Sequence, residues 1–184
     1  MALLAIETSG IAELQARLNA LGTDAPTAVI RAINKTRTNV MTRLLRWLVA
    51  ATGLPQARLR RSMRSFTATR ERPEAAITVY PGREVLIKFN QQQQREHLPP
   101  SGFRARMPGS GHVGYFERTR TSVRKSRGRP GKTFNLPIDE VMGPPFTAYL
   151  TGVGMADLLA YGGERLRSNM EHEIAFIEQQ AGMA

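Results

Sequence analysis

The sequence predicts an α+β fold: a long N-terminal helix and a C-terminal helix pack on a small antiparallel sheet, with a long basic loop. Apolar residues recur at helical spacing between Asp24 and Gly53, and again after residues 143–145. Short strand-like runs lie between these two stretches. A length of 184 residues suffices for one folded domain. We therefore expect a single domain over residues 1–184, with residues 91–132 as an extended loop or arm within it.

The N-terminal part should hold a short strand at residues 3–6 and a helix that begins after Ser9 and ends at Gly22. Asp24 is the expected N-cap of the long helix, with a glycine at position 53 where a C-cap belongs. At about 1.5 Å per residue this helix would be roughly 40 Å long. Its predicted buried face consists of Val29, Ile33, Val40, Leu44, Leu48 and Ala51.

The centre of the chain changes its pattern. Residues 55–65 resemble a short basic helix that begins with a proline. Residues 75–80 and 85–89 are strand-like on either side of Pro81-Gly82, which predicts an antiparallel hairpin. Brief strands are expected at residues 112–118 and 134–138. Otherwise the Gln-, Gly- and Pro-rich stretch 91–132 shows no regular pattern, and such long loops are usually functional or disordered.

The C-terminal helix follows Gly143-Pro144-Pro145, which breaks regular structure. Gly162 and Gly163 weaken its middle and favour a kink. Its predicted apolar face is Met155, Leu158, Leu159, Leu166, Met170, Ile174 and Ile177.

The formal net charge is +11, which predicts attraction to polyanions or acidic protein surfaces. Residues 31–72 carry eleven Lys and Arg against one acidic residue, whereas residues 139–184 are acidic. This opposition favours head-to-side contact between copies, as closed rings use. The predicted basic subunit-interface face is Arg43, Arg46, Arg58, Arg60, Arg61 and Arg64. The predicted acidic subunit-interface helix carries Glu164, Glu171, Glu173 and Glu178.

The basic loop at residues 118–132 is the segment with the clearest physical function. It would neutralise DNA phosphates without reading sequence, or dock on an acidic neighbour, and the sequence favours neither use over the other. No aromatic residue interrupts it, so base stacking is not expected. Its predicted polyanion or partner-ring contacts are Arg118, Arg120, Arg124, Lys125, Arg127, Arg129 and Lys132.

Catalytic patterns are weak, and no enzyme activity, metal or cofactor is expected. The chain has no cysteine, and His97, His112 and His172 lack the spacing of a ligand set. Residues 109–111 lack the strand and helix that a nucleophile elbow needs. Residues 128–133 end in Gly-Lys-Thr, but Ser126 stands where a phosphate-binding loop has its first glycine. We also expect no secretory leader and no membrane span.

Several segments together resemble the minor tail protein Z family of lambda-like phages. In chain order they are residues 32–36 within the long helix; Arg58, Arg60 and Arg61 after Gly53-Leu54-Pro55; Pro73 with residues 75–79; Phe116-Glu117-Arg118 before an Arg- and Gly-rich stretch; and residues 136–141 with Pro144-Pro145. The stretch 91–115 departs from the family pattern.

The resemblance implies a structural virion protein at the head-proximal end of the tail. There it would form a ring, expected as a homohexamer, that completes the tail and helps join it to the head. Its partners would be tail-terminator or head-connector proteins and genome DNA in the channel. It would be made in the host cytoplasm and have no contact with a membrane. Two alternatives are a stand-alone, sequence-independent nucleic-acid-binding protein and a metal-dependent nuclease. A nuclease would need a cluster of carboxylates for metal ions, and it is disfavoured because the acidic residues lie mainly on one helix.

Overall fold

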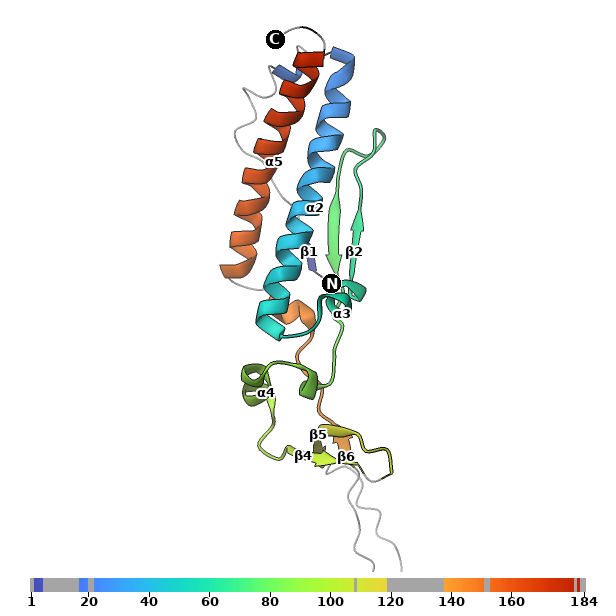
Figure 1. The fold of residues 1–184 in the computed structure, drawn as a ribbon, viewed down its shortest axis with the longest axis vertical. Helices are drawn as coiled ribbons and strands as arrows, with labels where there is room; N and C mark the ends of the chain where they lie inside the picture. Colours follow the sequence, from blue (N-terminus) through green and yellow to red (C-terminus); the bar gives the residue numbers. More distant parts are fainter. Residues whose placement is uncertain are drawn as a thin grey trace, which may run out of the picture. The chain divides into compact units, whose positions relative to one another are not determined.

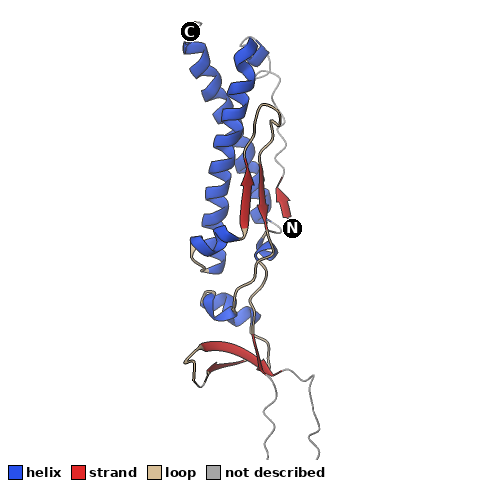
Figure 2. Cartoon of the chain, turned by 90° about the vertical axis from the view of Figure 1, so that its right-hand side faces the viewer, coloured by secondary structure: helices blue, strands red, loops and turns tan. Residues whose placement is uncertain are grey.

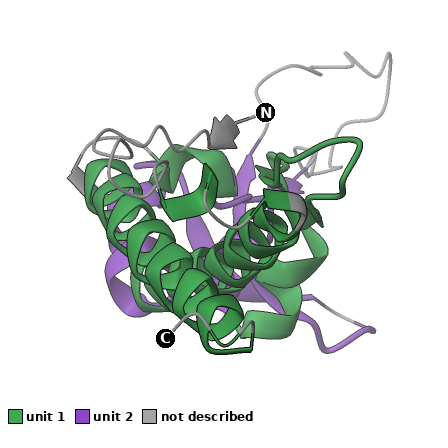
Figure 3. Ribbon diagram, turned by 90° about the horizontal axis from the view of Figure 1, so that it is seen from above, with its two compact units in different colours: residues 1–51, 55–82, 146–184 green, residues 52–54, 83–145 purple. Residues whose placement is uncertain are grey.

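The computed structural model describes residues 2–4, 17–19, 22–107, 109–118, 138–150, 153–180 and 182. It confirms the α+β class. The described chain divides into two compact units, coloured separately in Figure 3: unit 1 holds residues 1–51, 55–82 and 146–184, and unit 2 holds residues 52–54 and 83–145. The expectation of one domain stays a prediction, because compactness does not say whether each unit folds alone.

Unit 1 is built on two long helices, α2 (Ala25–Thr52) and α5 (Val153–Gln180), which run antiparallel side by side (Figure 1). A 3₁₀ turn, η1 (Gly22–Asp24), leads into α2. Gly53, at φ 73°, follows its last turn in the left-handed conformation that glycine adopts without strain. Both predicted long helices are confirmed. α5 is helical through Gly162 and Gly163 without a break.

The seam between α2 and α5 is lined on α2 by Ala28, Ala32 and Thr36, and further along by Arg43 and Trp47, which lie against Tyr161 and Gly154. Val40, Leu44 and Leu48 of α2 are also buried. At the seam's N-terminal end, Ala28 and Ala32 pack with the α5 residues Met170, Ile174 and Ile177. Of the predicted buried face, Val40, Leu44 and Leu48 are buried and Ala51 is half-buried. The prediction was wrong in the first turns, where the small alanines rather than Val29 and Ile33 lie in the centre of the seam and Val29 packs at its margin.

One polar contact crosses this apolar seam. Asn169 of α5 donates from Nδ2 to Thr36 Oγ1 at 2.9 Å, and both residues are buried. The Thr36 hydroxyl donates in turn to Ala32 O at 2.8 Å. A buried polar group that loses its partner is costly, so this chain of hydrogen bonds fixes the register of the two helices.

A three-stranded antiparallel sheet belongs to the same unit, in the order β1-β3-β2 (Figure 2). Its strands are β1 (Ala2–Leu4), β2 (Met63–Phe66) and β3 (Ala76–Val79). The segment after β2 is tied to α2 by a paired amide: Asn34 Nδ2 donates to Ala68 O at 3.0 Å, and Ala68 N donates to Asn34 Oδ1 at 2.9 Å. The sheet therefore lies alongside α2.

The predicted hairpin between residues 75–80 and 85–89 is wrong. β3 pairs with β2, in the register Met63 to Val79, and with β1 on its other side. Residues 86–88 instead form a 3₁₀ helix, η2 (Leu86–Lys88), in unit 2. The predicted basic helix is correspondingly short: α3 (Gln56–Arg61) ends before β2 begins. Within the segment 55–65 that was predicted as one helix, Ser62 ends α3 and residues 63–65 belong to β2.

Unit 2 contains the second antiparallel sheet, in the order β4-β5-β6, and helix α4 (Gln91–His97). Its strands are β4 (Phe103–Arg106), β5 (Val113–Arg118) and β6 (Ile138–Glu140). The expected strand at 112–118 is confirmed. Of the strand expected at 134–138, residues 134–137 lie outside the described residues, and Ile138 belongs to β6. A further 3₁₀ turn, η3 (Phe146–Tyr149), lies in unit 1.

The prediction of a structureless stretch over residues 91–132 is wrong for its first part. Asn90 caps α4 by accepting from Gln93 N at 2.9 Å, so the glutamine run is helical. Gln94 then donates to Ile87 O and Phe89 O at 2.9 and 2.6 Å, and accepts from the Tyr115 hydroxyl at 3.0 Å. Three side-chain hydrogen bonds thus tie α4 to η2 and β5. Residues 119–132 lie outside the described residues.

Replacing Thr36 with valine should lower the free energy of unfolding by about 1–3 kcal/mol, because Asn169 then keeps a buried, unpaired amide. Thr38→Val is the matched control. Thr38 also donates to the carbonyl four residues back, Asn34 O at 3.0 Å, but it is exposed, so a change within about 0.5 kcal/mol is expected. Urea denaturation measures both. Equal losses for the two variants would contradict the role of the buried contact.

Gln94→Glu should loosen unit 2, because a carboxylate would face the carbonyls of Ile87 and Phe89 in place of an amide donor. We expect faster amide exchange across α4 and β5, and a loss of about 1–3 kcal/mol in local stability. The control is Gln91→Glu, the same change at an exposed position of the helix. Unchanged exchange in Gln94→Glu would show that the three hydrogen bonds do not organise this unit.

Candidate partner-binding surfaces

Arginines gather on α3 and β2, and we call Arg58, Arg60, Arg61 and Arg64 the α3–β2 basic surface. Pro55 precedes α3 in an extended conformation, with φ −60° and ψ 138°. Leu59 is buried and anchors the short helix, so its neighbours on either side face outward. Ser62 N donates to Leu59 O at 3.0 Å and ends the helix directly before β2. Arg60, Arg61 and Arg64 are exposed, while Arg58 is half-buried.

The two α2 members of the predicted basic interface face differ from one another. Arg43 places its guanidinium carbon 4.4 Å from the ring centroid of Tyr161 on α5, and Arg165 approaches the same ring at 5.4 Å. Arg43 therefore stabilises the packing of its own chain through a cation–π contact. Arg46 is exposed on α2.

The predicted acidic interface helix has most of its carboxylates in pairs within the chain. Glu178 makes a two-point contact with Arg17, at 2.6 and 3.2 Å. Glu173 lies 3.9 Å from Lys35, and Glu171 lies 3.1 Å from Arg167 one turn earlier. Glu164 is exposed and, among the described residues, makes no such pair. The Arg167–Glu171 pair is exposed and contributes little, so a partner can replace it at small cost, whereas Glu173 and Glu178 are partly buried.

The predicted loop contacts fall mostly outside the described residues. Only Arg118 is described: it ends β5, is exposed, and lies 5.8 Å from the Phe103 ring centroid. The others outside the description are Arg120, Arg124, Lys125, Arg127, Arg129 and Lys132. Nearby in unit 2, His112 Nε2 lies 2.7 Å from Glu140 Oε1, so this histidine contacts a carboxylate that the sequence pattern did not indicate.

Two exposed aromatic residues were missed. Phe66 is 57% exposed at the end of β2, and Tyr80 is 39% exposed directly after β3. Arg64 lies between them on the sheet, with its guanidinium 5.9 Å from the Tyr80 ring. Met63 is buried, whereas Arg64, Ser65, Phe66 and Thr67 are all exposed. This stretch therefore lacks the alternation of a half-buried strand, and it carried no local signal for the exposed aromatic residues.

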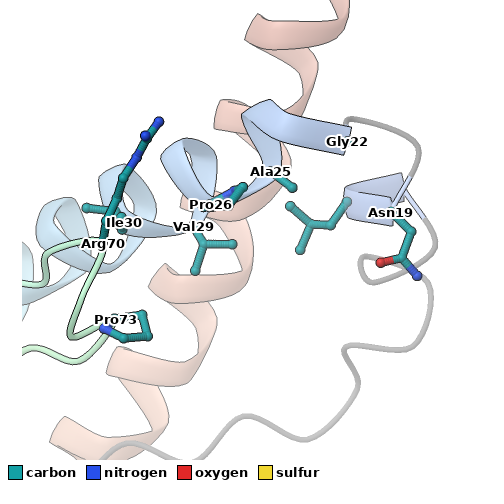
Figure 4. Close-up of a pocket in the computed structure, with 9 residues that line it drawn as sticks. Asn19, Gly22, Ala25, Pro26, Val29, Ile30, Arg70 and Pro73 are labelled. Carbon is teal, nitrogen blue, oxygen red and sulfur yellow. The ribbon is translucent and has the colours of Figure 1, made fainter.

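Catalytic chemistry is not organised among the described residues. A pocket of about 420 Å³ in unit 1 is lined by apolar side chains, Asn19 and Arg70, and its lining includes no carboxylate or histidine (Figure 4). Arg70 donates to Thr27 Oγ1 at 3.2 Å. No group of three or more potential metal ligands converges within the described part of the chain. Within that same part, no helix is long and apolar enough to cross a membrane.

The described surfaces of this α+β scaffold include clustered arginines and exposed aromatic residues, which are residue types enriched at protein interfaces. The model of the prophage minor tail protein Z (GPZ) family matches residues 9–140, and the chain belongs to this family. It is therefore a structural protein of the phage tail and a component of the virion. No curated protein and no solved structure matches the chain.

The clustered arginines should dominate any binding of polyanions. Arg60→Gln with Arg61→Gln should lower the slope of log affinity against log salt for a DNA duplex by about two, if each arginine neutralises one phosphate. Arg83→Gln with Arg95→Gln makes the same change in net charge at exposed arginines outside the cluster. Titration by fluorescence anisotropy at several salt concentrations measures both slopes. Equal slopes for the two double variants would show that only net charge matters.

Proposed function

We propose that this chain forms a ring at the head-proximal end of the phage tail, where it completes the tail and helps join it to the head. The single observation that carries the proposal is the family match over residues 9–140. The separation of charge supports it, because a basic surface and an acidic helix on one chain suit contact between successive copies. We expect a homohexamer.

The acidic helix and the α3–β2 basic surface, which are the two sides of this proposed contact, differ in the contacts that they make within their own chain. Glu171, Glu173 and Glu178 already face cations of their own chain. On the α3–β2 basic surface, Arg60 and Arg61 are exposed at the end of a short helix. We therefore propose that the α3–β2 basic surface is the main assembly contact. The acidic helix would contribute mainly through Glu164.

The residues from Arg118 to Lys132 remain proposed contacts to genome DNA or to a neighbouring ring of tail-terminator or head-connector proteins. DNA in a channel is contacted through its phosphates, and arginine suits that role without base readout. Both partners would be met only in the assembled particle.

Electron cryomicroscopy of the intact particle tests the proposed place. We expect density for this chain at the head–tail junction, with closed rotational symmetry, and native mass spectrometry of the purified chain should give the matching closed oligomer. Particles assembled without the chain are the control and should contain tails that fail to join heads. Density at the distal tip, or spread along the tube, would contradict the proposal.

A second candidate is a stand-alone, sequence-independent nucleic-acid-binding protein. The exposed Arg60, Arg61 and Arg64 favour it, since they lie on adjoining elements. It predicts duplex binding by the free chain that persists at physiological salt, and a chain that is missing from purified particles.

A further inference from the structure

The outer edge of β2 carries backbone groups that point away from the sheet. Tyr80 N donates to Ser62 O at 2.8 Å, so Ser62 and Tyr80 form a hydrogen-bonded pair of the antiparallel ladder. Such pairs alternate along the strand. In the observed register, the pairs of Arg64 with Thr78 and Phe66 with Ala76 follow the same parity. The N–H and C=O groups of Met63 and Ser65 therefore face the open side of β2.

The same alternation of hydrogen-bonded pairs shows how the open edge of β2 differs from the side of β3 that faces away from β2. In β3 the outward groups of Ile77 and Val79 face β1, which pairs with these residues at Leu4 and Ala2. β2 is the last strand in the order β1-β3-β2. Among the described residues, no backbone hydrogen bond reaches the outward groups of Met63 or Ser65. An edge of this kind is a template for one more strand.

The side chains along this edge have the composition of a binding surface. Phe66 and Tyr80 are the exposed aromatics, with Arg64 between them on one face of the sheet. On the other face, Arg37 of α2 donates to Ser65 Oγ at 3.0 Å, while its Nε is buried without a partner. Aromatic residues and arginine are enriched where protein partners bind most tightly.

The charge around β2 selects the partner. Arg60 and Arg61 lie just before the strand and Arg64 within it, whereas the nearest acidic residues along the chain are Glu71 and Glu74, the second of which faces Arg72 at 3.4 Å. Edge-to-edge pairing of β2 with the β2 of a second copy would bring the same arginines together and is disfavoured by their repulsion. Nucleic acid fits the N–H groups, but its phosphates are acceptors and would face the carbonyls of Met63 and Ser65.

We infer that the open edge of β2 binds an extended acidic segment of another virion protein, which adds as a fourth strand and lies against Phe66, Arg64 and Tyr80. This inference rests on the proposed role as a structural protein of the virion. The segment's main chain pairs with Met63 and Ser65, and its carboxylates face Arg64 and the arginines at the end of α3.

The test uses the full chain and a synthetic peptide of alternating valine and glutamate as the probe. Amide exchange followed by NMR should slow at least about tenfold at Met63 and Ser65 on saturation. Exchange at Arg64 and Phe66, whose N–H groups already face β3, should change little. A peptide of alternating valine and lysine is the control and should leave all four unchanged. Slowing without this alternation, or no slowing, would overturn the inference.

Matched variants separate strand pairing from charge alone. Ser65→Pro removes the outward N–H while leaving the bonds between β2 and β3, and should weaken peptide binding at least about tenfold. Ser65→Ala loses the same contact with Arg37 but keeps the N–H, so it should bind nearly as the parent does. Equal binding by the two variants would overturn the inference. If Ser65→Pro fails to fold, the alternation of exchange in the parent chain decides.

Charge is tested in the same assay. Arg64→Gln should weaken peptide binding severalfold, whereas Arg83→Gln, an equal change in net charge in unit 2, should not. Binding of random duplex DNA or self-association with the alternating exchange pattern would replace the acidic segment with another occupant and overturn the assignment. A chain placed elsewhere in the particle would refute the proposed function yet leave the peptide result intact.

Discussion

The packing of α2 against α5 is the constraint on which the rest of unit 1 depends. Ala28 and Ala32 pack with Met170, Ile174 and Ile177 at one end of the seam, and Arg43 contacts Tyr161 further along. Apolar seams are tolerant of sliding, because one aliphatic contact replaces another. The hydrogen bond from Asn169 to Thr36 is directional, and it permits one register. With α2 fixed, Asn34 positions the segment after β2, and through it the sheet.

Because unit 1 depends on this helix packing, several charged residues of α2 and α5 make contacts within the chain, whereas arginines of the α3–β2 basic surface are exposed. The carboxylates of α5 that lie toward α2 meet the cations Arg17 and Lys35, so they support the scaffold. Arg43 is used in the same way on Tyr161. The α3–β2 basic surface follows the end of α2 along the chain, and its members Arg60, Arg61 and Arg64 are exposed. Arg64 lies on β2 itself, so positive charge is present at the open strand edge.

The long elements were predictable from sequence because their apolar periodicity extends over many turns. Short elements were not, since their pairing is decided by distant residues. Ala76 to Val79 has the composition of a strand, but nothing local shows that it pairs with Met63 to Phe66 instead of the residues after Gly82. The glutamines at 91–94 carry no apolar signal, and their helix depends on the Asn90 cap and the contacts of Gln94. The family could be predicted, because it rests on the order of several weak segments along the chain.

The open edge of β2 exposes backbone groups that a second copy can pair with, and the side chains of β2 oppose this pairing. An unpaired strand edge invites a second copy to add to it, and short strands bearing basic residues are a common protection. β2 has four residues, one of them Arg64, and it follows Arg60 and Arg61. Two copies that approach edge to edge would bring these like charges together, and their repulsion opposes the pairing. An acidic segment meets the opposite condition, because the same arginines attract it. The charge that keeps the free chain from pairing with itself therefore also defines which strand can complete the sheet.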